Sequence, residues 1–384
     1  MTTRKLDPVR MAMVGGGPGA FIGPVHRIAA ELDGQVRLVA GAFSSAPERS
    51  REAARGYGLS DDRAYPDWQS LLAGEAARPD GAELIAIVTP NHLHLPVAVA
   101  ALDAGFHVMS DKPATATLAE ALQLRGAVAR ARGHYALTYT YSGYPLVRHA
   151  REMVASGAIG TVRKLVVEYV QGWLADPIER DGSKQAGWRV DPARSGAGGC
   201  IGDIGVHAFH LAEFVTGVRV EELMADLGTV VPGRTLDDDC SLLLRFANGA
   251  RGVLIASQIS IGELNGLRLR VHGDKGSLDW RQEEPNSLFW HKADGSSEIL
   301  RTGTPPIGHA GQVATRVPAG HPEGYLEAFA NLYRDFAARL RGVHDAPLLP
   351  GIQEGVRSMA LIDRAVSASR DGAGWVRLDE GTGS

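Results

Sequence analysis

The stretch that decides the fold is Met11-Ala-Met-Val-Gly-Gly-Gly-Pro-Gly-Ala-Phe-Ile-Gly23. Its first four residues predict a short apolar strand, and residues 25–32 predict a helix. Glycines between a strand and a helix let a pyrophosphate approach the amides at the helix N-terminus, where partial positive charge lies. The order of elements therefore favours a dinucleotide-binding loop over a flexible surface loop.

The spacing of these glycines departs from the usual G-x-G-x-x-G pattern. Gly15 and Gly17 fit its first two positions. The third position falls on Ala20 or, if the loop is longer, on Gly23. We expect this loop and the start of the helix to contact the cofactor through Gly15, Gly17, Ala20, Phe21, Ile22 and Gly23.

The residues after the second predicted strand, 36–43, bear on the choice of cofactor. An acidic residue about 20 positions beyond the glycines normally binds the adenosine ribose. Here Ser44 and Ser45 stand in its place, with Arg49 one turn later. Hydroxyls and an arginine could accept the 2′-phosphate of NADP, and the same hydroxyls could bond the free 2′-OH of NAD. These residues leave both cofactors open.

The chain divides into two parts with different sequence patterns. Strand and helix patterns alternate over residues 1–140, which predicts an α/β domain with a parallel sheet covered on both faces. Residues 141–384 carry longer β segments, a helix at 202–215, a Gly- and Pro-rich loop at 305–322 and two terminal helices. We expect a Rossmann domain over 1–140 and a second α/β domain over 141–384. The terminal helices could pack back on the first domain.

Composition excludes several classes of protein. The chain has 384 residues, 44% of them hydrophobic and 22% charged, which is typical of a globular protein with two domains. A net charge of -4 gives no basis for a nucleic-acid partner, and two cysteines make no disulfide framework. We see neither a signal peptide nor an apolar run of roughly 20 residues for a membrane span. We therefore expect a cytoplasmic protein with no membrane partner.

A lysine follows the predicted strand 106–110, in Asp111-Lys112-Pro113. Because Pro113 disfavours the helical conformation of the residue before it, we expect Lys112 to be extended. It would then lie at the carboxyl end of a parallel sheet, where such folds bind ligands. By itself, this lysine would also fit a solvated surface position.

The second half contains Gly198-Gly-Cys-Ile-Gly-Asp-Ile-Gly-Val-His-Ala-Phe-His210. In a helix, Asp203 and His207 would share a face. The aspartate could orient the imidazole or bind a hydroxyl, and the histidine could take a proton from a carbinol. The alternatives are an N-cap aspartate with a core histidine, or a metal site that includes His210. No second Cys or His cluster supports a metal, so we expect none.

Together these motifs resemble the glucose–fructose oxidoreductase/inositol dehydrogenase/MocA (Gfo/Idh/MocA) family. The glycine loop matches, as does Thr89-Pro-Asn-His-Leu-His94 after a buried strand. Asp111-Lys112-Pro113 matches the family's Glu-Lys-Pro, with Asp in place of Glu. Gly202-Asp203-Ile-Gly-Val-His207 matches its Asp-x-x-x-His helix. The resemblance extends over nearly the whole chain and is nearest to the inositol and L-glucose dehydrogenase-like branch.

The resemblance implies a Rossmann domain and an α/β domain whose large, mostly antiparallel sheet often mediates dimers or tetramers. It implies that Lys112 bonds the reacting hydroxyl and favours its deprotonation, that His207 is the acid/base, and that Asp203 holds both in place. Lys112 would also touch the nicotinamide ribose. Thr89, Asn91 and His94 would line the cofactor side, and NAD is slightly favoured over NADP.

A sugar or cyclitol is the substrate class that this branch implies. Polar and aromatic residues at Tyr141, Trp188, Arg189 and His321 suit a polyol, although ordinary packing would explain each of them as well. We expect an NAD(P)-dependent oxidoreductase acting on a secondary carbinol. The alternatives are a redox-cycling enzyme, which cleaves or epimerises glycosides through a transient keto-sugar, and a non-catalytic sensor.

Overall fold

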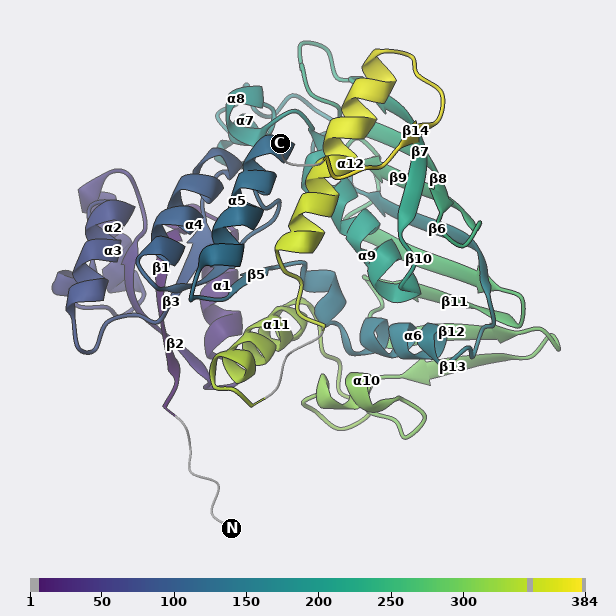
Figure 1. Ribbon diagram of the computed structural model, residues 1–384, viewed down its shortest axis with the longest axis horizontal. Helices are drawn as coiled ribbons and strands as arrows, with labels where there is room; N and C mark the ends of the chain where they lie inside the picture. The colour runs from purple at the N-terminus through teal and green to yellow at the C-terminus, as the bar shows by residue number, and fades with distance from the viewer. Residues whose placement is uncertain (1–6, 344–347, 382–384) are drawn as a thin grey trace. The chain divides into compact units, whose positions relative to one another are not determined.

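The computed structural model describes residues 7–343 and 348–381 and divides the chain into two compact units (Figure 1). Unit 1 comprises residues 1–138 and 329–356, and unit 2 comprises residues 139–328 and 357–384. Each unit contains one β-sheet. In the described residues no helix is long and apolar enough to cross a membrane.

Unit 1 is built on a five-stranded parallel sheet in the order β2-β1-β3-β4-β5. All five residues of β3 are buried, which explains its almost continuous apolar sequence. The strands are β1 (Val9–Gly15), β2 (Val36–Ala42), β3 (Leu84–Val88), β4 (His107–Ser110) and β5 (Tyr135–Leu137). The helices are α1 (Ile22–Glu31), α2 (Pro47–Gly56), α3 (Trp68–Ala77), α4 (His94–Asp103), α5 (Leu118–Arg130) and most of α11 (Tyr325–Leu340).

The strand order of unit 1 reverses between β1 and β3, which are neighbours in the sheet. Gly15, the last residue of β1, lies opposite Val88, the last residue of β3. In open α/β sheets, ligands bind outside the carboxyl ends of the strands at such a reversal. The fold thus places the glycine loop and the loop after β3 at the expected ligand crevice.

Local sequence signals mark several helix ends in unit 1. Asp67 is the N-cap of α3, and its Oδ1 accepts a hydrogen bond from Ser70 N at 2.7 Å. Thr117 and Glu120 form a capping box at the start of α5. Gly105 follows α4 with a φ of 90°, the left-handed conformation that ends a helix.

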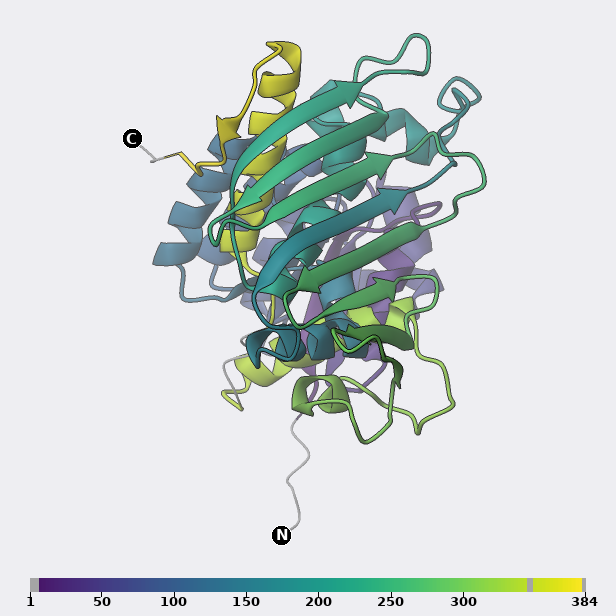
Figure 2. The same cartoon turned by 90° about the vertical axis from the view of Figure 1, so that its right-hand side faces the viewer.

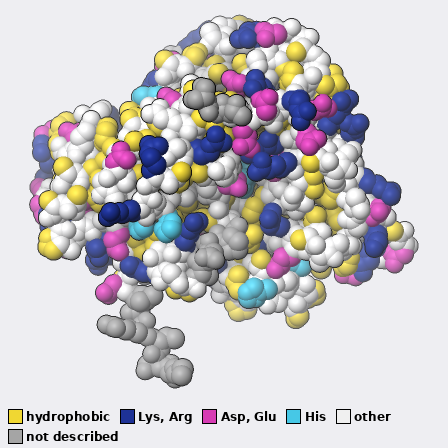
Figure 3. Space-filling view, viewed as in Figure 1, with side chains coloured by type: hydrophobic (Ala, Val, Ile, Leu, Met, Phe, Trp, Pro, Cys, Tyr) yellow, Lys and Arg dark blue, Asp and Glu magenta, His cyan; other side chains and the backbone are white. Residues whose placement is uncertain are grey.

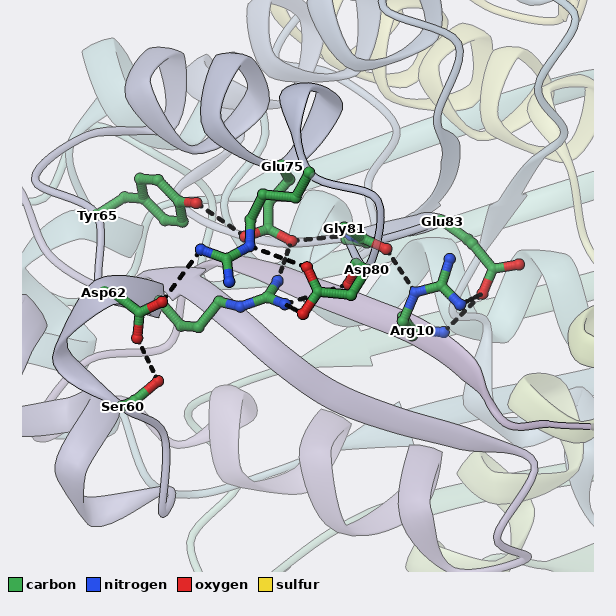
Figure 4. A network of polar contacts seen from close by, with 11 residues as sticks. Arg10, Ser60, Asp62, Tyr65, Glu75, Asp80, Gly81 and Glu83 are labelled. Carbon is green, nitrogen blue, oxygen red and sulfur yellow. Dashed lines mark hydrogen bonds and ion pairs between the residues drawn. The ribbon is translucent and has the colours of Figure 1, made fainter.

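A polar network joins α3 to the segments around it in unit 1 (Figure 4). The carboxylate of Glu75 in α3 is buried, yet it accepts hydrogen bonds from Arg63 at 2.7 Å and from Tyr65 at 2.8 Å. It also accepts one from Ala82 N at 2.8 Å. The buried charge is therefore paired and hydrogen-bonded, and it ties the turn before β3 to the helix.

Unit 2 contains a nine-stranded sheet in the order β13-β12-β11-β10-β6-β9-β8-β7-β14. Only β6 and β9 pair in parallel, so the sheet is mostly antiparallel, as the family resemblance implies. Its longer strands are β6 (Val162–Val170), β7 (Val220–Gly228), β8 (Asp239–Phe246), β9 (Arg251–Ser257) and β10 (Gly266–Gly273). The others are β11 (Gly276–Arg281), β12 (Ser287–Lys292), β13 (Ser297–Arg301) and β14 (Val376–Arg377).

The two faces of this sheet differ. Helices α6 (Pro145–Ala155) and α9 (Val206–Thr216) pack on one face, against strands such as β6, β10 and β11. In Figure 2 no helix of the described chain lies over the other face. In β8, Leu242 and Leu244 are buried while Leu243 between them is 46% exposed. The alternation is that of a sheet with one covered face.

The structure corrects several expectations about unit 2. The helix expected over 202–215 begins instead with a π-helical turn, Ile201–Gly205, that leads into α9. The loop expected over 305–322 contains a short helix, α10 (His309–Val313). Strands β7, β12, β13 and β14 lacked a clear sequence signal because their outward positions are polar or their runs are short. The remaining helices are α7 (Lys184–Arg189), α8 (Pro192–Ser195) and α12 (Ile352–Arg370).

Candidate active site

The loop after β1 needs glycines because other backbone segments approach it closely. A Cβ on Gly17 would lie 2.4 Å from the carbonyl oxygen of Phe43, and one on Gly23 would lie 2.4 Å from Gly16 Cα. Gly23 therefore takes the third glycine position, because it lets α1 pack against the loop. This packing favours the longer-loop alternative, and Ala20 lies within the loop.

The start of α1 suits a phosphate group. Its N-cap residue, Phe21, has an exposed ring and makes no side-chain hydrogen bond to the helix. Gly19 has a φ of +78°, and no atom lies within 4 Å of the Cβ position it lacks. A helix N-terminus without a side-chain cap, reached by a loop without bulk, fits the pyrophosphate of a dinucleotide.

The residues after β2 lie beside this loop. The guanidinium of Arg49 is exposed and donates a hydrogen bond to the carbonyl of Pro18 at 3.4 Å. The hydroxyl of Ser44 accepts a hydrogen bond from Ala46 N at 3.2 Å, and Ser45 is exposed. The tertiary structure thus brings all three residues to the edge of the glycine loop, where an adenosine ribose would bind.

A buried histidine joins the two loops that follow β3 and β4. The ring nitrogens of His94 lie 2.7 Å from the carbonyl of Pro113 and 2.9 Å from that of Thr89. Burial lowers the pKa of His94. Asn91 is also buried, and the Thr89 hydroxyl is buried with no hydrogen-bond partner among the described residues. An unpartnered hydroxyl at the strand-order reversal is a group that a bound cofactor could satisfy.

Lys112 lies at the carboxyl end of β4, where the sequence places it. The carboxylate of Asp111 accepts hydrogen bonds from Lys112 N and from the Thr138 hydroxyl, both at 2.9 Å. The Lys112–Pro113 peptide is cis, and the lysine is half-buried. Asp111, where the family has Glu, therefore orients the backbone on which the lysine stands.

In unit 2, Asp203 lies in the π-helical turn and is held by two donors. Its Oδ2 accepts hydrogen bonds from Arg189 Nε at 3.0 Å and from Gln258 Nε2 at 2.9 Å. The guanidinium carbon of Arg189 lies 4.3 Å from the ring centre of Trp188 and 5.8 Å from that of Trp173. Trp188, Arg189 and Asp203, three of the residues expected at the site, thus belong to one cluster.

His207 follows in the first turn of α9 and is surrounded by tyrosine rings. The ring centre of Tyr141 lies 4.9 Å from that of the imidazole, that of Tyr139 5.8 Å and that of Tyr169 6.1 Å. Tyr139 and Tyr141 contact His207 edge to face. These contacts hold the imidazole in one orientation, as a positioned acid/base requires.

Two of these tyrosines share a closed set of hydrogen bonds with an asparagine. The Tyr169 hydroxyl donates to Asn265 Oδ1 at 2.6 Å, and the hydroxyls of Tyr141 and Tyr169 lie 2.5 Å apart. Asn265 Nδ2 donates to the Tyr141 hydroxyl at 3.4 Å. Burial raises the pKa of both tyrosines. Both phenols are therefore protonated at neutral pH and can donate hydrogen bonds.

Two other sequence candidates lie in different surroundings. His210 stacks on Tyr139 with ring centres 4.2 Å apart, and burial lowers its pKa to about 3. His321 is exposed, and its Nδ1 lies 3.1 Å from the carbonyl of Pro318 in its own loop. In residues 7–343 and 348–381, no three His, Cys, Asp or Glu side chains are grouped so that they could hold a metal.

Sequence reasoning missed Tyr169, Asn265 and Gln258. The three residues lie at or just beyond strand ends in β6, β10 and β9, and only the sheet brings them to α9. One signal was available, the polar and aromatic run Tyr169-Val-Gln-Gly-Trp173 at the end of a strand. Such runs at strand ends favour a binding site over packing.

Comparisons with known proteins agree with this architecture. Residues 9–139 match the model for the oxidoreductase family with an NAD-binding Rossmann fold, and residues 147–279 match the GFO/IDH/MocA C-terminal domain. The fold and these matches define a two-domain, NAD-binding oxidoreductase. The chain belongs to the Gfo/Idh/MocA family.

Relatives resemble the chain over its length. An uncharacterized oxidoreductase of Bacillus subtilis is 33% identical over 97% of both chains. An inositol dehydrogenase homolog from Azotobacter vinelandii, solved with NADH and myo-inositol, is 36% identical with a TM-score of 0.89, and the match covers 97% of this chain and 98% of that one. Levoglucosan dehydrogenase of Pseudarthrobacter phenanthrenivorans is 28% identical over 98% of this chain and 99% of its own.

Proposed function

We propose that the protein is an NAD-dependent dehydrogenase that transfers hydride between the nicotinamide and a secondary carbinol of a sugar or cyclitol. The observation that carries this proposal is the setting of His207. An acid/base histidine stands among tyrosine hydroxyls, with Asp203, Gln258 and Asn265 nearby in unit 2. A polyol needs many donors and acceptors, and its C–H faces pack on aromatic rings.

NAD is the cofactor that we propose. The Azotobacter vinelandii homolog was solved with NADH. In this chain Arg49 donates to the backbone of the glycine loop, while Ser44 and Ser45 offer hydroxyls to a ribose. Gly15, Gly17 and Gly23 with the start of α1 would hold the pyrophosphate, and Thr89 and Asn91 would face the nicotinamide side. The bound cofactor supplies a hydride acceptor.

We assign the catalytic roles to Lys112, Asp203 and His207. Lys112, a cation, bonds the reacting hydroxyl and favours its ionised form. His207 takes the proton as the carbinol is oxidised, and its orientation comes from the tyrosine rings. Asp203 carries negative charge four positions before this histidine in the chain, and Arg189 and Gln258 fix the position of its carboxylate.

The substrate class follows from the side chains near His207 and from the relatives. The names of two relatives give myo-inositol and levoglucosan, both rich in hydroxyls and compact. Tyr141, Trp188 and Arg189 are the substrate contacts that we propose in unit 2. For His321, which is exposed in its own loop, a contact at the rim of the site is proposed.

A second copy of the chain is the partner that we propose for the open face of the nine-stranded sheet. Apolar side chains such as Leu243, Val253 and Ile255 are at least partly exposed there. Beside them, on β10, β11 and β6, lie the ion pairs Arg268–Asp279 and Arg270–Glu168. A face with apolar residues and paired charges of both signs is self-complementary, which a symmetric dimer requires. Figure 3, seen from the direction of Figure 1, shows Lys, Arg, Asp and Glu side chains scattered over a different face of the molecule.

The test is absorbance at 340 nm with purified protein, NAD and NADP in parallel, and a panel of inositol isomers, D- and L-glucose, other aldoses and anhydrosugars. We expect NADH formation with a narrow set of polyols, from protein that light scattering shows to be oligomeric. A substrate consumed without net NADH would instead indicate redox cycling. Dinucleotide binding without turnover of any polyol would indicate a sensor.

A further inference from the structure

The start of the helix that carries Asp203 and His207 is bound by a residue from elsewhere in the chain. The carboxylate of Asp237, just before β8, accepts hydrogen bonds from Gly199 N at 2.5 Å and from Ile201 N at 2.8 Å. Its Oδ2 also accepts from the Cys200 thiol at 3.1 Å. The main-chain oxygen of Asp237 accepts from Cys200 N at 2.8 Å. One aspartate thus accepts hydrogen bonds from three consecutive backbone amides.

Glycine at position 199 is required by this contact. A Cβ there would lie 2.0 Å from the carbonyl oxygen of Asp237, closer than any side chain could come without displacing that backbone. At Gly198 a Cβ would lie 2.7 Å from the side chain of Ile201. Gly199 therefore serves the approach of residue 237 and Gly198 the packing of Ile201, and both are structural uses distinct from ligand binding.

The same short segment also positions Asp203 from its other side. Asp238 O accepts a hydrogen bond from Gln258 N at 2.9 Å, and Gln258 Nε2 donates to Asp203 Oδ2 at 2.9 Å. Asp203 N in turn donates to Gly199 O at 2.9 Å. Residues 237 and 238 therefore hold both the backbone before Asp203 and the amide that binds its carboxylate.

The π-helical turn makes this positioning consequential. Such turns carry one residue more per turn than an α-helix and cost stability unless the surroundings hold them. The extra residue lies between the contact at Gly199–Ile201 and His207, so a shift at the helix start rotates both Asp203 and His207. Burial raises the pKa of the Asp237 carboxyl, while the amides of Ile201 and Gly199 lower it.

We propose that Asp237 is a positioning residue for the acid/base pair, acting as a remote N-cap that sets the orientation of Asp203 and His207. The assignment rests on the proposed function for its kinetic consequences, but its structural consequence is independent of turnover. Because a misplacement of about 1 Å can cost about a hundredfold in rate, a smaller displacement of the acid/base pair should still have a measurable effect.

The test compares Asp237→Asn with Asp238→Asn. Asp238 is the control for loss of a buried carboxylate, because its contact with Gln258 is made by the main-chain oxygen, which the substitution keeps. Its carboxylate accepts hydrogen bonds from Val230 N at 2.7 Å and Val231 N at 2.9 Å and pairs with Arg234 at 3.5 Å, and these partners lie outside the helix. The readouts are kcat and KM for the polyol, the pH profile of kcat, and the ring signals of His207 in ¹H–¹³C NMR spectra. Those signals depend on the flanking tyrosine rings and are assigned with His207→Gln.

We expect both variants to lower the thermal midpoint, but only Asp237→Asn to shift the His207 signals and lower kcat about tenfold with KM within twofold. Its pH profile of kcat should also move. If Asp237→Asn does not fold, Cys200→Ala removes one donor to the same carboxylate and should shift the His207 signals in the same direction by less.

Unchanged His207 signals in Asp237→Asn, or in Cys200→Ala where it replaces that variant, overturn the proposal. Equal shifts in Asp237→Asn and Asp238→Asn overturn it too. Absence of turnover in the wild-type protein on every polyol would contradict the proposed function instead, and the NMR comparison would then decide the positioning role alone.

Discussion

The chain contains two glycine-rich stretches that each lead into a helix, and the glycines have different roles in the two. In Gly15–Gly23 the glycines allow close approach of backbone from β2 and β3, and the N-cap residue of α1 makes no side-chain hydrogen bond. In Gly198–Gly205 the backbone of Asp237 approaches instead, and its carboxylate caps the helix start.

This comparison shows that glycines before a helix are not by themselves enough to define an anion site. The deciding feature is whether a carboxylate of the protein already accepts hydrogen bonds from the first backbone amides of the helix. Where one does, as at Asp237, the glycines anchor the helix and orient the groups that it carries. Where none does, as at α1, the helix N-terminus remains suited to a phosphate.

The prediction with the largest expected effect tests whether the Gly198–Gly205 stretch serves catalysis rather than cofactor binding. Replacing His207 with Gln should lower kcat about a thousandfold, because a positioned acid/base is lost. NAD affinity, measured by fluorescence titration, should stay within a few-fold of wild type. His291→Gln, an exposed histidine in β12, is the matched control and should leave both values unchanged. Normal turnover in His207→Gln would remove this residue from the mechanism.

The same two helices, α1 and α9, each contain a buried histidine whose pKa is lowered, and these histidines should make the stability of the fold depend on acid pH. Burial lowers the pKa of His210 in α9 to about 3 and that of His26 in α1 to about 4. Each ring is neutral in the folded protein and takes up a proton near pH 6.5 when unfolded. The unfolded state therefore binds more protons below pH 6.5, and the stabilisation present above that pH is lost as pH falls.

Between pH 6.5 and pH 4, the wild-type free energy of unfolding should fall by about 3 kcal/mol more than that of His210→Gln. Urea unfolding followed by tryptophan fluorescence measures the difference, and Trp280 is a buried reporter in unit 2. Parallel pH curves for the two proteins would contradict the neutral, buried state of His210.

The predictions with the smallest expected effects compare the two stretches directly, with one glycine replaced by alanine in each. Gly17→Ala places a Cβ 2.4 Å from Phe43 O, and Gly199→Ala places one 2.0 Å from Asp237 O. We expect the first to weaken NAD binding about tenfold and the second to lower kcat about tenfold with NAD affinity retained. Gly56→Ala in α2, where the added Cβ would meet no atom within 4 Å, is the control and should leave both values unchanged. Loss of NAD binding in Gly199→Ala would erase the distinction.

How far sequence reasoning reached differed between the two units. In unit 1 the strand, loop and helix pattern and the position of Lys112 were predicted, because each depends on neighbours in the chain. In unit 2 the motif around Asp203 and His207 was recognised by resemblance, but the π-helical turn was not. Its shape depends on Asp237, which is 34 residues from Asp203 by their numbers.

By itself, the sequence determined the α/β class, the glycine loop at the first strand and the candidate acid/base pair, since local periodicity and turn chemistry encode these features. Only the tertiary structure decided that Gly23 is the third loop glycine, that Tyr169 and Asn265 lie beside His207, and that Asp237 caps the helix start. The reason is physical: strand register and long-range hydrogen bonds bring distant residues together, and neither is written in the spacing of neighbours along the chain.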